Sequence, residues 1–184
     1  MFQIEVDKKI RLELTHFHHK NDIFKVVDKN RELFGKWFSW MDDDHSKEDT
    51  KKFIQSTLDE YAQNRQVNCC IFFKDKLVGN IALLGMKNKK NDTKKGEIGY
   101  WLDSKYHKKG IMRKCVVKML EIGFGYYALD KISIRCATIN ERSCNIPAKL
   151  GFTHEGVLRS DISVNEKFYD GNIYSILRDE FKNN

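Results

Sequence analysis

The most informative part of the sequence is GEIGYWLDSKYHKKGIMRK, which runs from Gly96 to Lys114. Its first seven residues, 96–102, are largely apolar and predict a strand. Apolar residues then recur at 111, 112, 115, 116, 119 and 120, the spacing of an amphipathic helix that extends to about Tyr127. The segment therefore predicts a strand that leads through a basic turn into a helix.

This turn has the properties of a phosphate-binding site. Between Ser104 and Leu120 there are six lysines or arginines and no acidic residue. A helix start exposes unpaired amides and the positive end of a dipole, and Gly110 lets the backbone come close to a ligand. We therefore expect a diphosphate here, with a merely charged helix face as the alternative. Because GxxxxGK[ST] and GxGxxG are both absent, kinase-like and dehydrogenase-like functions lose support.

The rest of the chain mixes strands and helices. Alternating or β-branched apolar residues predict strands at 2–6, 10–14, 67–73, 77–86, 131–137, 152–158 and 172–177. Helical spacing predicts helices at 21–28, from a capping box at Ser46 to about Gln63, and at 140–150. With 184 residues, one proline and no Gly/Ser-rich run, we expect a single domain over residues 1–184.

Composition restricts the partners and the location. The formal charge of +7, from 33 basic and 26 acidic side chains, indicates an anionic partner. No apolar stretch approaches the length of about 18 residues that spans a bilayer, and the first residues do not resemble a secretion signal. We expect a cytoplasmic protein that does not bind membranes.

Cysteine and histidine patterns give no sign of a metal. The five cysteines are an odd number without a CxxC pair, so we expect reduced and mostly buried thiols. The run from His16 to His19 contains three histidines, but the sequence shows no carboxylate or cysteine at ligand spacing beside it. The sequence therefore predicts no metal site.

Four stretches together carry a family resemblance: EIGYWLDSKYHKKGIM (97–112), NERSCNIPAKLGF (140–152), EGVLR (155–159) and NRELFGKWFSW (30–40). They resemble the GNAT superfamily of acyl-CoA-dependent N-acetyltransferases, and within it the RimJ/RimL branch, over nearly the whole chain. The resemblance implies an α/β (α+β) fold with a mixed, mostly antiparallel central sheet flanked by helices. It also implies transfer of an acetyl group from acetyl-CoA, the cosubstrate, to a primary amine.

The resemblance assigns residues to the coenzyme. In the superfamily the turn reads [QR]xxGx[GA] and its amides hold the pyrophosphate; here His107, Gly110 and Met112 stand at these positions, so two of the three depart from the pattern. The strand ending at Leu102 is expected to splay from its neighbour and to bind the pantetheine arm through its backbone. The residues expected to bind the coenzyme are Tyr100, Trp101, Leu102, His107, Lys108, Lys109, Gly110, Ile111, Met112, Asn140 and Ser143.

Amine acetylation needs a neutral nucleophile and a stabilised leaving thiolate. Glu97, on the strand beside the thioester, is the first candidate base, although a partly buried structural acid is the alternative. Asp161 is its rival. Many relatives protonate the thiolate with a tyrosine at the position of Pro147, so this role is expected to fall to Ser143. Cys144 is interpreted as a packing residue.

The acceptor amine stays open at this stage. RimL-type enzymes acetylate the amino terminus of an acidic ribosomal protein, which suits a basic enzyme. Polyamines, antibiotics and peptide conjugates are small-molecule alternatives. A catalytically silent CoA-binding protein and a nucleic-acid-binding module are remoter, and direct nucleic-acid binding is not expected. The lysine-rich loop 87–95 is solvated, or contacts substrate or coenzyme, and the chain is a monomer or a homodimer.

Overall fold

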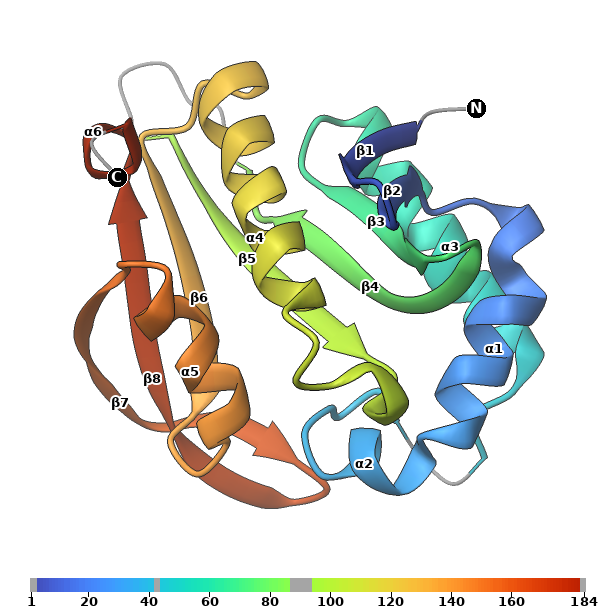
Figure 1. The fold of residues 1–184 in the computed structure, drawn as a ribbon. Helices are drawn as coiled ribbons and strands as arrows, with labels where there is room; N and C mark the ends of the chain where they lie inside the picture. The colour runs from blue at the N-terminus through green and yellow to red at the C-terminus, as the bar shows by residue number, and fades with distance from the viewer. Residues whose placement is uncertain (1–2, 42–43, 87–93, 183–184) are drawn as a thin grey trace.

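The computed structural model describes residues 3–41, 44–86 and 94–182, which fold around one eight-stranded sheet (Figure 1). The strands are β1 (Gln3–Asp7), β2 (Ile10–Leu14), β3 (Val67–Phe73), β4 (Lys76–Leu84), β5 (Lys95–Leu102), β6 (Lys131–Ala137), β7 (Thr153–Val164) and β8 (Lys167–Leu177). Their order is β1-β2-β3-β4-β5-β6-β8-β7, and only the β5–β6 pair is parallel. The expected mixed, mostly antiparallel sheet is confirmed.

Helices cover both faces of the sheet. They are α1 (Lys20–Lys29), α2 (Arg31–Gly35), α3 (Lys47–Ala62), α4 (Ile111–Glu121), α5 (Glu141–Lys149) and α6 (Arg178–Lys182). The expected capping box begins α3, since the Ser46 side chain accepts from the Asp49 amide and the Asp49 carboxylate accepts from the Ser46 amide. No helix in the described residues is long and apolar enough to cross a membrane.

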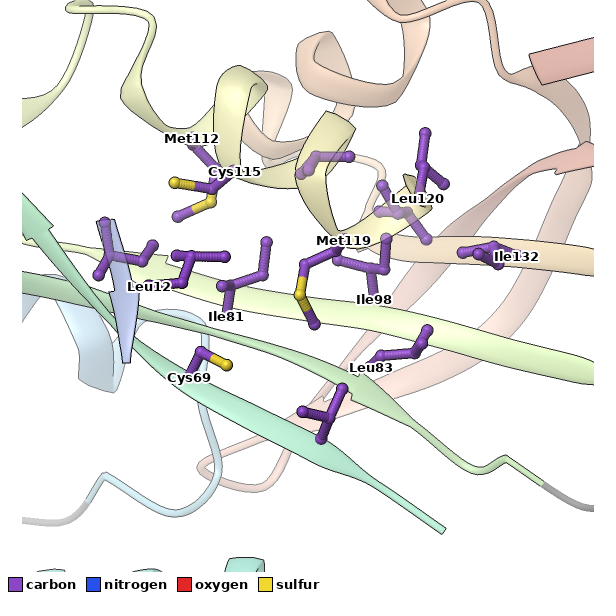
Figure 2. Close-up of a cluster of buried hydrophobic side chains, with 14 of the residues drawn as sticks. Leu12, Cys69, Ile81, Leu83, Ile98, Met112, Cys115, Met119, Leu120 and Ile132 are labelled. Atoms are coloured by element: carbon purple, nitrogen blue, oxygen red, sulfur yellow. The ribbon is translucent and has the colours of Figure 1, made fainter. Parts of the chain in front are cut away.

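Strand alternation divides the core into two clusters. Ile71 of β3 lies in the cluster under α4, where Figure 2 shows Met119 pointing toward the strands. Its neighbour Phe72 faces the other way and packs with Ile54 of α3. The cysteines are free and at least partly buried, and burial raises the pKa of Cys69 to about 12. Reduced and mostly buried thiols are as expected.

The sheet separates between β5 and β6. These strands pair only from Lys95 with Lys131 to Glu97 with Ser133, whereas β5 continues to Leu102 and β6 to Ala137. Beyond Glu97 their backbone groups therefore diverge (Figure 1). This is the expected splay, and it opens the middle of the sheet.

Several elements differ in extent from the sequence predictions. Strands β7 and β8 are longer than 152–158 and 172–177, because a polar bulge between Leu158 and Ile162 hides the alternation. Asn165 and Glu166, both at positive φ, form the tight turn between them. The helix expected to reach about Tyr127 is α-helical to Glu121 and continues as a π-helix from Ile122 to Tyr126, so its extent is confirmed. The short helix α6 was not predicted. The loop 87–95 lies outside the described residues, except for residues 94 and 95.

Candidate active site

The separation of β5 and β6 holds a cleft of about 500 Å³. Its walls are residues 98–102 of β5 and 135–137 of β6, residues 106–113 at the start of α4, residues 33, 34, 37 and 38 around α2, part of α5 with its cap, and residue 162. Ile98 packs in the cluster under α4, so strand alternation places Tyr100 on that side and Trp101 on the side of α2. We call these the α4 side and the α2 side of the cleft.

The turn before α4 fits a phosphate ligand. Gly110 precedes the helix with φ of 74°, and a Cβ placed on it would meet only Arg113 Nη2, at 4.0 Å. The side chains of Ile111 and Met112 are buried in the core, so the large residue at 112 does not crowd the helix start (Figure 2). Open backbone amides beside a glycine in this conformation suit the linked phosphates of acetyl-CoA.

The basic side chains around this turn are only partly neutralised. Lys114 is paired with Asp7 at 2.6 Å and Lys118 with Glu121. No carboxylate of the described residues forms an ion pair with the other four, which are Lys105, Lys108, Lys109 and Arg113. Their charge is available for an anionic ligand.

His107 ties the turn to both walls of the cleft. Its Nε2–H donates to the Leu102 carbonyl at 2.9 Å, and its Nδ1 accepts from Arg142 Nη1 at 2.8 Å. Burial lowers the pKa of His107, and the Arg142 charge adds to this, so the ring is neutral with its proton on Nε2. Sequence reasoning missed Arg142, because nothing local to the chain reveals that the start of α5 faces residue 107.

The structure brings Tyr100, Asn140 and Ser143 together on the α4 side. Asn140 Oδ1 accepts from the Ser143 amide at 3.2 Å and so caps α5. The Tyr100 hydroxyl lies 3.2 Å from the Ser143 carbonyl oxygen and 3.3 Å from Ser143 Oγ. Burial raises the pKa of Tyr100 above its usual range, which keeps this hydroxyl protonated. Nearby, the free thiols of Cys136 and Cys144 lie 2.8 Å apart.

Both candidate bases meet at one arginine near the α2 side. Arg135 Nε lies 3.1 and 3.0 Å from the two Glu97 oxygens, and its Nη1 lies 3.4 Å from each Asp161 oxygen. Burial lowers the pKa of Arg135, but the two carboxylates raise it more, so the guanidinium stays charged. Gly171 makes room for this contact, because a Cβ there would lie 2.7 Å from Asp161 Oδ2.

The histidine run does have a carboxylate beside it, contrary to the sequence expectation. Glu13 Oε2 lies 3.1 Å from His19 Nε2, and ligand atoms of Glu13, His18 and His19 lie within 4.8 Å of one another. However, His19 Nδ1 accepts from the His16 amide at 3.2 Å, which leaves the ring proton on Nε2, facing Glu13. Metal binding at Nε2 would require the ring proton to move to Nδ1, where it would face the His16 N–H and break that hydrogen bond, so we interpret the cluster as a structural hydrogen bond.

Comparison with known proteins agrees with this geometry. Residues 11–153 match the family described as acetyltransferase (GNAT) domain. The chain belongs to the GNAT family. Its relatives include the putative ribosomal N-acetyltransferase YdaF of Bacillus subtilis, 26% identical over 99% of this chain and 98% of that protein. The ribosomal-protein-serine acetyltransferase of Escherichia coli is 25% identical over 96% and 97% of the two chains.

A solved structure is similar over the same extent. The microcin C7 self-immunity acetyltransferase MccE, in complex with acetyl-CoA and AMP, superposes with a TM-score of 0.87 at 25% identity, covering 95% of each chain. This GNAT enzyme is therefore an acetyltransferase of the RimJ/RimL branch that uses acetyl-CoA as cosubstrate, and its chemistry needs no metal.

Proposed function

We propose that residues 1–184 act as a single domain that acetylates the α-amino group at the amino terminus of a ribosomal protein. The observation that carries this proposal is a cleft with unneutralised cations on its α4 side and two carboxylates near its α2 side. Its E. coli relative is named for a ribosomal-protein substrate, and the charge of +7 suits an acidic protein. Cytoplasmic location follows from such a substrate.

In the proposed reaction the amine reaches the thioester from the α2 side. An α-amino group has a pKa near about 8, so it must lose a proton to become nucleophilic. Glu97, held by Arg135, takes that proton directly or through a water, and Asp161 is the alternative base. The amine nitrogen forms a bond to the carbonyl carbon and the C–S bond breaks. Ser143 donates a hydrogen bond to the departing sulfur, and the second proton of the amine passes to that sulfur, which leaves as the thiol of the coenzyme.

A small-molecule amine is the second candidate acceptor. Phe34, Trp37 and Phe38 line the α2 side of the cleft, and their rings suit an apolar or planar substrate. The solved MccE complex also contains AMP. A thiol-release screen of free amino-terminal peptides, polyamines, aminoglycosides and aminoacyl nucleotides separates the two candidates. If no amine releases thiol and acetyl-CoA does not bind at low salt, the proposed function is wrong.

The role of Glu97 is tested by Glu97→Gln. We expect turnover to fall about 100-fold at pH 7 but only about tenfold at pH 9, because at high pH the amine needs less help to lose its proton. Affinity for acetyl-CoA should not change. The control is Glu155→Gln, since Glu155 pairs with Lys131 outside the cleft. An equal loss at both pH values would remove Glu97 as the base, and the same profile for Asp161→Asn would transfer the role to Asp161.

A further inference from the structure

Pro147 leaves a carbonyl of α5 without its helical donor. In a regular helix the N–H of residue 147 would donate to the carbonyl of Ser143, but proline has no N–H. The Tyr100 hydroxyl, which comes from β5 across the cleft, lies 3.2 Å from that carbonyl oxygen. A side chain of the sheet thus replaces a missing bond of the helix.

The same hydroxyl also reaches the side chain of Ser143, whose Oγ lies 3.3 Å away. We propose that Tyr100 is a positioning residue for Ser143, holding Oγ at the cleft so that the serine proton can turn toward the departing sulfur. This inference rests on the proposed function, since it deepens the role of Ser143 in that reaction.

Geometry and charge support this role. Tyr100 lines the cleft and is half-buried, and desolvation raises its pKa above the usual range, so its hydroxyl remains a donor throughout. When negative charge develops on sulfur, the Ser143 O–H turns to it and the Tyr100 proton turns from the carbonyl to Oγ. No proton leaves Tyr100. The Asn140 cap on the Ser143 amide fixes the backbone while the two hydroxyls rotate.

The test is a double-mutant cycle with Tyr100→Phe and Ser143→Ala. We expect Tyr100→Phe to lower turnover about tenfold while the KM for acetyl-CoA changes less than about twofold. Because Tyr100 acts through Ser143, the double variant should be no slower than Ser143→Ala alone. The proposal would be overturned if the loss of turnover in the double variant equalled the product of the two single losses. It would also be overturned if Tyr100→Phe raised the KM for acetyl-CoA and left turnover unchanged.

A further variant separates positioning from folding. Pro147→Ala supplies an N–H for the Ser143 carbonyl, so Tyr100→Phe in this background leaves no carbonyl without a donor. We expect Tyr100→Phe to lower turnover about tenfold in the Pro147→Ala background as well. The melting temperature of the double variant should equal that of Pro147→Ala alone. Full recovery of turnover would show that Tyr100 only satisfies the carbonyl, and would overturn the proposal.

The control is Tyr127→Phe, which removes a hydroxyl from a half-buried tyrosine outside the cleft and should leave turnover unchanged. Calorimetry with acetyl-CoA and thermal melting accompany every assay, so binding and stability are measured apart from activity. If the unsubstituted enzyme releases no thiol with any amine, the proposed function fails. If it is active and Tyr100→Phe is not impaired, only the positioning role fails.

Discussion

The two sides of the cleft are built in different ways. On the α4 side, the turn that we expect to bind phosphate and the end of the strand before it come from one continuous stretch, residues 100–113. Near the α2 side, Glu97, Arg135 and Asp161 come from three strands. Asn165, in the turn between β7 and β8, donates a hydrogen bond to Gly35 at the end of α2. The turn of the α4 side is local in sequence, whereas the group of charged residues near the α2 side exists only once the chain has folded.

The largest expected effect is on the affinity for acetyl-CoA and tests the turn on the α4 side. In Gly110→Asp a carboxylate stands where the phosphates are expected, and we predict that affinity for acetyl-CoA falls about 100-fold, measured by calorimetry. Aspartate tolerates the positive φ of this position better than most side chains do, so the fold should persist.

Gly110→Asn is the matched control, because it has the same shape and the same tolerance of positive φ without the charge. We expect it to lose less than about tenfold in affinity. Equal losses for the two variants would mean that side-chain volume, rather than phosphate charge, governs this turn, and the comparison between the two sides would lose its electrostatic basis.

The same contrast explains what the sequence could predict. The strand, turn and helix around Gly110 follow from periodicity, a glycine and clustered cations, all of which are visible locally. The family resemblance added the splay of β5, which the structure confirms. Asp161 could not be placed beside Glu97, because a bulge in β7 turns it back toward Arg135, and a bulge within a polar run has no periodic signal.

Contacts between distant segments were also beyond the sequence. The bond between Tyr100 and Ser143 depends on α5 lying across the cleft from β5, and the His107–Arg142 contact depends on the same packing. The histidine run is a case in which the two residues are close in sequence. The spacing did not predict a carboxylate partner, but the fold of β2 places Glu13 against His19. Each of these contacts depends on how the chain folds, and the composition of the sequence does not reveal it.

A smaller effect is expected where the α2 side is tied to the hairpin. Asn165 Nδ2 donates to the Gly35 carbonyl at 3.1 Å, joining the β7–β8 turn to the end of α2. Asn165→Asp keeps the positive φ but loses this donor, so the KM for the acceptor should rise about fivefold, the equivalent of one hydrogen bond. The KM for acetyl-CoA should stay constant.

Asn165→Gly separates the lost contact from the added charge. It adopts the same backbone conformation and lacks both the donor and the carboxylate. If the contact matters, both variants raise the acceptor KM alike. A change confined to the aspartate variant would instead indicate repulsion of the substrate, and a parallel change in the KM for acetyl-CoA would show that the two sides are not independent.

The smallest expected effect concerns the long-range contact between His107 and Arg142 on the α4 side. The pKa of His107 is lowered from its ordinary value of 6.5, chiefly by burial, so the unfolded chain takes up a proton at a higher pH than the folded chain does. Its contribution to stability is therefore complete above about pH 7 and is lost as the pH falls through 6.5 and below.

His107→Gln removes the titration while keeping an amide donor for the Leu102 carbonyl. From pH 7.5 to pH 5 the melting temperature of the unsubstituted enzyme should fall more than that of the variant, by no more than about 2 °C. His19, whose pKa burial also lowers, titrates in both proteins and cancels in the difference. A constant difference across this range would mean that His107 does not tie the turn to Arg142 through its neutral ring. The shape of the turn before α4 would then follow from the local sequence alone.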